Sequence, residues 1–555
     1  MPPHPSPSPP LSQRATHRRC ACCAGRSAIC ALLLLALALM PLAAAAAAAR
    51  TVVYCPQAAP VGLQPALRTD APSFEASART IYDRLLDFGP HGTEPQPALA
   101  TAWQVSADGL AYTVQLRHGV RFQSNFGFAP TRMFDADDVL FTFDRMLDPR
   151  HPYHAVSGGT YGYAQSMELP ALIRAVRKID PYTVRFELSQ PYAPFPALLA
   201  MDFASIASAE YAESLLRAGR AQDFDLQPIG TGPFSLEHQI AGTMLRFGAF
   251  RGHWRGAPAY DHLVFAITPD SAVRWARLRR GECDIIGFPN PDDLPAMRAD
   301  PNVRVLQAPG LNEGYLAFNT EHGALRDARV RRALVLAVNR RVIVDAVFGA
   351  EGTVASGALP PAMWSFDPTS ALPDHDMAEA RRLLAAAGHA GGFDLDLWVA
   401  TGQGILRDPR RIALMIQSDW AAVGVRARIR SVEWAELLAR TARAEHDVAL
   451  MTWLSDNGDP DNFIATLLRC SAVHTTQNLS EYCSRPLDAL FARARSEADP
   501  ARRAALYAQA QRAFARDVPW LPLVHVHETF VVSKRLRGEL LQPLLSPRFE
   551  RLRVD

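Results

Sequence analysis

The sequence predicts a mixed α/β protein with at least two domains. Residues 112–117 and 182–188 alternate apolar and polar side chains, which is typical of strands with one buried face. Residues 376–388 and 409–423 repeat apolar positions at helical spacing, which predicts amphipathic helices. About 500 residues follow the N-terminal segment, more than one hydrophobic core accommodates.

The first 49 residues have the pattern of a secretory signal. Four arginines within residues 14–26 precede a leucine-rich run at 31–40, and an alanine tract then ends at Arg50. The small residues favour cleavage over retention of the segment as a membrane anchor. A lipid anchor is not expected, because the cysteines of this segment all precede the leucine run. We therefore expect residues 1–49 to be removed and the mature protein to be exported.

The rest of the chain has the composition of a water-soluble protein. No later segment is long and apolar enough to predict a membrane span. The net charge of +2 argues against a nucleic-acid or polyanion partner.

Four cysteines follow the signal: Cys55, Cys283, Cys470 and Cys483. An even number in an oxidising compartment predicts two disulfides, out of three possible pairings. A zinc site is the alternative. It is disfavoured, because these cysteines do not form the C-x2-C pairs that zinc sites usually show.

The sequence offers little support for catalysis or for a cofactor. It has no Gly-x-Ser-x-Gly elbow, no Gly-x4-Gly-Lys-Ser/Thr loop and no His-Glu-x-x-His motif. His525 and His527 would share one face of a strand and could ligate a metal ion. The local sequence supplies only Glu528 nearby and no third ligand, so we interpret them as interior or interlobe histidines.

An acidic turn at residues 453–463 is the most informative motif. The strand-forming run 447–453 leads into Asp456, Asp459 and Asp461, and Asn-Gly and Asp-Pro steps break the strand. The glycine is in the wrong position for an EF-hand calcium loop. Taken alone, such a turn is more often a solvated Asx-type turn than a binding site.

The same run resembles one in periplasmic dipeptide-binding proteins, the peptide-specific branch of the large extracellular solute-binding proteins that serve ABC importers. Similar stretches occur in that family's order at residues 82–86, 100–122, 135–145, 228–234, 309–319, 330–339, 360–364 and 416–425. The resemblance covers about residue 51 to the C-terminus.

The resemblance implies a class II periplasmic binding protein of the large peptide-binding type, with a ligand cleft between two lobes. Lobe I would span residues 50–308, with residues 527–555 returning to it, and lobe II would span 309–526. The disulfides would be Cys55–Cys283 and Cys470–Cys483. Hinge closure would bury the ligand. The function implied is a non-enzymatic, monomeric periplasmic receptor that binds a dipeptide or short peptide and delivers it to an inner-membrane permease.

The resemblance also implies the roles of particular residues. Asp456 would hold the α-ammonium group of the peptide, and Trp453 and Trp434 would be walls of the pocket. Backbone groups near Gly310 and Asn312 could pair with an extended peptide as an added strand. Asp459 and Asp461 would shape the loop. Because tryptophans are largely buried wherever they occur, core packing is the alternative for both tryptophans.

The chain departs from the family at one position. Dipeptide-binding relatives carry an arginine about six residues past the equivalent of Trp398, and it holds the carboxylate of the ligand. Here that position is near Gly404. Arg407 could substitute, although Asp408-Pro409 suggests that it belongs to the start of the next helix. We hypothesise that this carboxylate clamp is weakened or lost.

The sequence leaves two alternative functions open. The same fold could bind a polyamine, haem, glutathione, nickel or a cationic antimicrobial peptide, as other members of the wider family do. A secreted hydrolase that uses Asp456 and Asp459 is the enzymatic alternative.

Overall fold

The computed structural model describes residues 49–89, 92–401, 405–541, 544 and 547–555. Its central feature is a mixed sheet of twelve strands. Ten lie in the order β16 (Val425–Val432), β15 (Phe393–Ala400), β17 (Val448–Leu454), β13 (Asn312–Phe318), β18 (Trp520–Ser533), β11 (Ile285–Gly287), β1 (Thr51–Cys55), β10 (His262–Ala266), β9 (Met244–Ala249) and β8 (Phe234–Ile240). The other two, β12 (Val303–Pro309) and β14 (Gly352–Val354), pair with β18. Parallel pairing joins β1 to β10 and β11, and β15 to β16 and β17.

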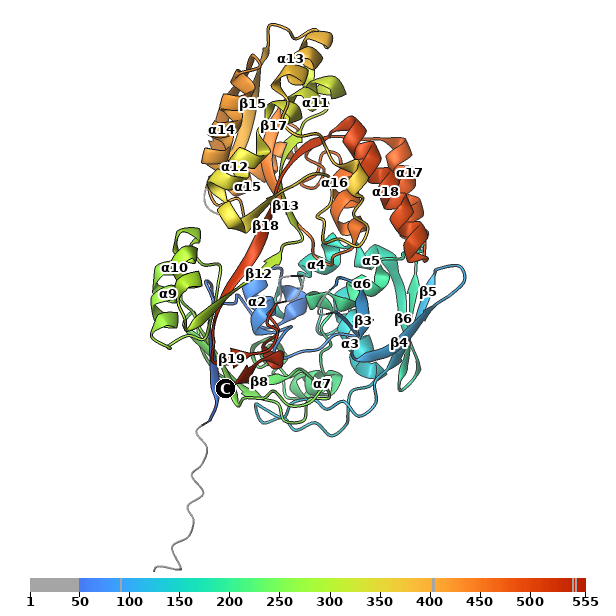
Figure 1. Cartoon of the computed structure of the whole chain (residues 1–555). Helices are drawn as coiled ribbons and strands as arrows, with labels where there is room; N and C mark the ends of the chain where they lie inside the picture. The colour runs from blue at the N-terminus through green and yellow to red at the C-terminus, as the bar shows by residue number, and fades with distance from the viewer. Residues whose placement is uncertain (1–48, 90–91, 402–404, 542–543, 545–546) are drawn as a thin grey trace, which may run out of the picture. The chain divides into compact units, whose positions relative to one another are not determined.

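The long strand β18 belongs to both halves of this sheet. Its residues 520–526 pair with β13 and β14, whereas residues 527–533 pair with β12 and, in part, with β11. Figure 1 shows it as the long red strand that runs from β13 to β12. The two halves of the sheet are therefore connected by one continuous strand, β18.

A second, antiparallel sheet consists of β4 (Ala100–Val105), β5 (Ala111–Leu116), β7 (Thr183–Leu188) and β6 (Ile173–Asp180), in that order. Two short hairpins complete the strands, β2 (Leu86–Phe88) with β3 (Pro95–Pro97) and β19 (Leu536–Arg537) with β20 (Arg553–Val554). The helices of eight or more residues in the described part of the chain are α3 (Ala136–Leu147), α7 (Ala209–Arg217), α9 (Ser271–Arg279), α11 (Ala328–Ala337), α12 (Arg340–Val347), α13 (Met377–Ala386), α14 (Pro409–Ala421), α15 (Trp434–Thr441), α17 (Arg485–Ser496) and α18 (Pro500–Asp517).

The elements predicted from periodicity are confirmed. The two alternating stretches are β5 and β7, and the two amphipathic stretches are α13 and α14. Asp376 caps the start of α13 and Asp408 caps that of α14, because each carboxylate accepts backbone N–H groups of the first turn. The strand expected before the acidic turn is β17.

Four clusters of buried apolar side chains form the core of the described residues. One consists of residues between 311 and 526. The other three consist of residues between 52 and 303, together with residues 530–552. On this basis we propose the lobe boundaries given by the resemblance: lobe I as residues 50–308 with 527–555, and lobe II as residues 309–526.

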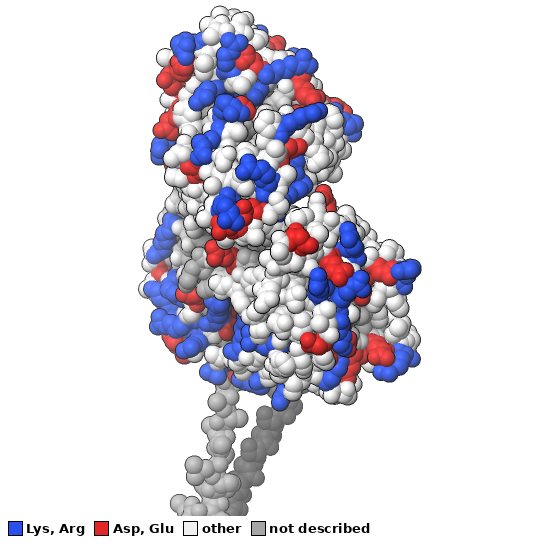
Figure 2. Space-filling model, turned by 90° about the vertical axis from the view of Figure 1, so that its right-hand side faces the viewer, with Lys and Arg blue, Asp and Glu red and all other residues white. Residues whose placement is uncertain are grey.

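None of the helices in the described ranges combines the length and the apolar composition that a membrane span requires. On the face drawn in Figure 2, basic and acidic side chains are interspersed. This distribution agrees with the small net charge of the chain.

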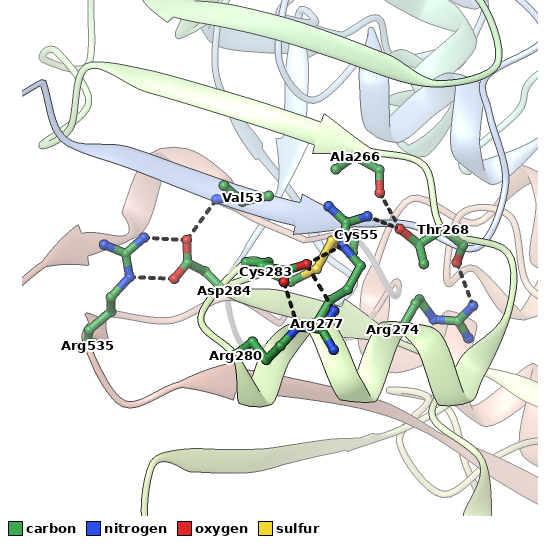
Figure 3. Close-up of a disulfide and its surroundings, with 11 residues drawn as sticks. Val53, Cys55, Ala266, Thr268, Arg274, Arg277, Arg280, Cys283, Asp284 and Arg535 are labelled. Atoms are coloured by element: carbon green, nitrogen blue, oxygen red, sulfur yellow. Dashed lines mark hydrogen bonds and ion pairs between the residues drawn. A yellow bond between two sulfur atoms is a disulfide. The ribbon is translucent and has the colours of Figure 1, made fainter. Parts of the chain in front are cut away.

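Both disulfides implied by the resemblance are present. Cys55, at the end of β1, is bonded to Cys283, which lies between α9 and β11 (Figure 3). Next to this bond, Asp284 accepts the backbone N–H of Val53 and pairs with Arg535, so the C-terminal segment is tied to β1 and β11. Cys470 and Cys483 close a loop with a sequence separation of 13.

We expect replacement of both Cys470 and Cys483 by alanine to lower the free energy of unfolding by about 2–3 kcal/mol. The bond restricts the unfolded chain, and the magnitude is that of a loop of roughly 15 residues. Denaturant unfolding of the double variant and the original protein measures the difference. An unchanged midpoint, with mass spectrometry confirming the loss of one disulfide, would contradict this expectation.

Candidate functional site

The acidic turn is a tightly hydrogen-bonded loop at the end of β17. The backbone N–H of Ser455 donates to the carbonyl of Leu311, which extends the pairing of β17 with β13. The Ser455 hydroxyl accepts the N–H of Gly458 at 2.9 Å, and the amide oxygen of Asn457 accepts that of Asp459 at 3.0 Å. These side-chain bonds replace the strand ladder where the chain turns.

Gly458 cannot be exchanged for a larger residue without disturbing this loop. Its φ is +66°, and a Cβ atom there would lie 2.3 Å from the Cβ of Thr93. The Thr93 hydroxyl donates to the Gly458 carbonyl at 3.2 Å. A residue of proposed lobe I therefore contacts the backbone of the loop, which only glycine permits.

Two buried ion pairs hold carboxylates of the loop in place. Asp459 accepts two hydrogen bonds from Arg503, at 2.6 and 2.7 Å, and Asp461 accepts two from Arg495, at 2.8 and 3.0 Å. Asp459 also accepts the backbone N–H of Asp461. Asp459 and Asp461 thus shape the loop, as expected. A hydrolase that uses Asp456 and Asp459 would lack a free second carboxylate.

Asp456 differs from its two neighbours, because no Lys or Arg of the described residues forms an ion pair with it. One of its carboxylate oxygens accepts the Tyr163 hydroxyl at 2.8 Å, and the other accepts the amide of Asn462 at 3.1 Å. The Asn462 side chain also accepts the backbone N–H of Asp456. Burial raises the pKa of Asp456, and the hydrogen bonds from Tyr163 and Asn462 oppose that rise. The site therefore holds a partly desolvated carboxylate that lacks a counter-ion among the described residues.

A cavity of about 240 Å³ opens beside Asp456. It is lined by residues from two distant segments of the chain, including Ser166, Met167, Glu168, Gln190 and Tyr192 from one, and Trp453, Asp456, Asn462, Arg469, Gln477 and Arg495 from the other. The first segment belongs to proposed lobe I and the second to proposed lobe II. Apolar and aromatic side chains, among them Met167, Leu172 and Trp453, line the cavity together with polar and charged groups, as in sites that bind small molecules.

Of the two tryptophans predicted as pocket walls, one lines this cavity. Trp453 is half-buried, and its indole N–H donates to the carbonyl of Asn462 at 3.0 Å. Trp434 begins α15 and is 45 % exposed, so core packing does not account for it. Trp434 is not among the lining residues, and its role as a pocket wall stays a prediction.

Gly310 and Asn312 lie where β13 meets β18, outside the lining of the cavity. The Asn312 amide donates to the carbonyl of Val526 at 2.8 Å and accepts its N–H at 2.8 Å. A Cβ on Gly310 would lie 2.4 Å from that carbonyl. The Asn312 side chain therefore joins two strands. Pairing of this backbone with a ligand stays a prediction.

Arg407 directly precedes Asp408, the residue that caps α14, as the sequence suggested. It is in the left-handed region with φ +57°, and its guanidinium is 2.6 Å from the carboxylate of Glu351. The Glu351 side chain is 1 % exposed. Arg407 thus forms an ion pair with a buried carboxylate and does not line the cavity. The family position near Gly404 lies outside the described residues.

The two histidines of β18 have separate environments. His525 is buried, with Nδ1 2.6 Å from the carbonyl oxygen of Asn312, and Nε2 of His527 is 2.8 Å from the Thr353 hydroxyl. In the described part of the chain, no group of three or more His, Cys, Asp or Glu side chains is arranged to hold a metal ion.

Comparison with known proteins identifies the family. The profile of the bacterial extracellular solute-binding proteins, family 5 (middle region), matches residues 94–475. This chain belongs to that family. The family consists of non-enzymatic components of transport systems, and its members are two-lobed binding proteins of the periplasm.

Individual family 5 proteins match most of the chain. The dipeptide-binding protein of Escherichia coli (strain K12) is 43 % identical over 508 residues, which cover 91 % of this chain and 95 % of that protein. Heme-binding protein A of Haemophilus influenzae is 41 % identical, covering 91 % and 92 %. The crystal structure of a dipeptide binding protein from Pseudoalteromonas sp. SM9913 in complex with Met-Leu has a TM-score of 0.76 and 34 % identity, covering 91 % and 100 %.

Several residues of the site were missed by sequence reasoning. Tyr163 and Asp456 are separated by 293 positions, and no local pattern links them. Arg469 and Gln477 follow the acidic turn, but nothing in their spacing directs them to a cavity. Asn462 lies within the motif itself, and the preference of asparagine for turn hydrogen bonds could have pointed to its role.

Proposed function

We propose that this protein is the periplasmic receptor of an ABC importer and that it binds dipeptides or other short peptides between its two lobes. The observation that carries the proposal is Asp456, a partly buried carboxylate that pairs with no cation of the described residues and lies beside a cavity lined from both proposed lobes. A free peptide supplies the missing cation, its α-ammonium group. Relatives at 43 % and 34 % identity bind dipeptides by name.

The rest of the transport cycle follows from this role. Residues 1–49 direct export and are cleaved, and the mature protein acts as a monomer. Contacts of the ligand with both lobes favour the closed form, because a ligand shifts an equilibrium only through its differential affinity for the two states. The closed form then presents the peptide to the permease in the inner membrane.

Haem is the second candidate, and Heme-binding protein A, at 41 % identity, is the observation that favours it. The cavity beside Asp456 favours a smaller ligand with an amino group. A single experiment separates the two: thermal unfolding of protein purified without refolding, alone and with Met-Leu, N-acetyl-Met-Leu or haem.

We expect Met-Leu to raise the melting temperature, because a ligand at a hundredfold excess over its Kd stabilises the folded form by about 2.7 kcal/mol. N-acetyl-Met-Leu should have a much smaller effect, because acetylation removes the ammonium group. Stabilisation by haem without any effect of a peptide panel would overturn the proposal. Native mass spectrometry of the same sample would identify a ligand retained from the cell.

A further inference from the structure

A second charged residue in the cavity has no partner among the described residues. Two arginines line the cavity, and Arg495 is paired with Asp461. The other is Arg469. Its guanidinium forms no ion pair with any residue of the described ranges, and its buried Nε–H has no hydrogen-bond acceptor there. A buried donor that is left unsatisfied is rare in native proteins and calls for an explanation.

The backbone around Arg469 is well fixed. Its N–H donates to the carbonyl of Ala465 at 3.0 Å, and its carbonyl accepts the amide of Asn478 at 3.1 Å. It follows α16 (Thr466–Leu468) and precedes Cys470, half of the Cys470–Cys483 disulfide. The base of the side chain is therefore held in place, as a preorganised ligand contact requires.

Asp456 and Arg469 have complementary charges and line the same cavity. Both line the same cavity, one anionic and one cationic, and neither is neutralised by a described residue. The ligand that satisfies both has an ammonium group at one end and a carboxylate at the other. Guanidinium groups bind carboxylates through two parallel N–H···O bonds, a geometry that an amide cannot fully accept.

We infer that Arg469 binds the terminal carboxylate of the peptide whose ammonium group is held by Asp456, so that the site selects short zwitterionic peptides. This inference rests on the proposed function. The cavity volume of about 240 Å³ fits it, because the volume is below the ~300–1,000 Å³ of sites for drug-sized ligands. The carboxylate clamp has not been lost with the family arginine near Gly404. It lies on a different segment.

Other charged residues are less suited to this role. Arg407 is 2.6 Å from the buried Glu351 and does not line the cavity. Arg495 is bonded to Asp461 through its Nε, at 2.8 and 3.0 Å. Glu168 also lines the cavity but is exposed, so its carboxylate remains hydrated.

The test is calorimetry with Met-Leu and with its C-terminal amide, on the original protein and on Arg469→Gln. We expect the original protein to bind Met-Leu at least about 30-fold more tightly than the amide, as for a charge pair that loses one member. Arg469→Gln should bind Met-Leu more weakly by a similar factor and should bind the amide as the original protein does.

Two further variants serve as controls for this test. Arg407→Gln should leave the preference for the free carboxylate unchanged, because Arg407 lies outside the cavity lining. Arg469→Lys keeps the charge without the paired geometry, and should give an intermediate affinity for Met-Leu. It also replaces Arg469→Gln in the comparison if that variant does not fold.

The inference would be overturned by equal affinity of the original protein for Met-Leu and its amide, or by full discrimination retained in Arg469→Gln. If Arg407→Gln lost the preference for Met-Leu over its amide, the residue that binds the carboxylate would be Arg407 and not Arg469. Failure of the proposed function looks different, because then neither Met-Leu nor its amide would bind to any of the proteins.

Discussion

Replacing Asp456 by asparagine is expected to weaken the binding of a free dipeptide by about 2–5 kcal/mol, which is the usual cost of removing one partner of a buried charge pair. Asparagine has nearly the same shape, and its carbonyl can still accept the Tyr163 hydroxyl bond that Asp456 accepts at 2.8 Å. The change should therefore reduce binding without collapsing the loop. Calorimetry with Met-Leu measures the loss, and melting without ligand verifies the fold.

N-acetyl-Met-Leu is the matched control for the charge pair. It should bind poorly to the original protein and about equally poorly to Asp456→Asn, because each change removes one member of the same pair. Equal binding of free and acetylated peptide by the original protein would refute the role of Asp456.

The pH dependence of peptide binding is a second test of the role of the Asp456 carboxylate. Burial raises the pKa of Asp456, so the charged form that binds an ammonium group is lost as pH falls through this raised pKa, above the ~3.9 of an exposed aspartate. Tyr163→Phe removes a hydrogen bond that lowers this pKa. Its loss of binding should thus begin at a higher pH. A phenylalanine variant with the same acid profile as the original protein would contradict this role of Tyr163.

The sequence contained most of the local information about this site. The strand-forming run 447–453 predicted β17 and the turn residues predicted the loop, while the pairing of the cysteines was implied by the family resemblance. Local spacing could not place Tyr163 or Arg469. Their positions depend on how segments hundreds of residues apart pack, and that depends on the whole core. The motif around Gly310 and Asn312 was recognisable in the sequence. The hydrogen bonds between the Asn312 side chain and the backbone of Val526 were not predictable from it, because they depend on the pairing of β13 with β18.

Replacing Arg503 by methionine should have the largest effect on stability, a loss of about 3–5 kcal/mol in the free energy of unfolding. Removal of one partner leaves the other as an uncompensated buried charge. Both side chains of the pair with Asp459 are only 8 % exposed, and Arg503 also donates to the carbonyl of Ala494. Arg502 is the matched control, since it lies next to Arg503 on α18, is 70 % exposed and pairs with Glu497.

Arg502→Met should cost no more than about 1 kcal/mol, the limit for exposed ion pairs. Combining Arg503→Met with Asp459→Asn should cost less than the sum of the two single changes, because the second substitution removes the stranded charge. Denaturant unfolding of the four variants measures these differences. Similar losses for Arg503→Met and Arg502→Met would show that the buried pair does not stabilise the loop. If the expected difference is found, Arg503→Met should also weaken Met-Leu binding, because the backbone that positions Asp456 is continuous with Asp459.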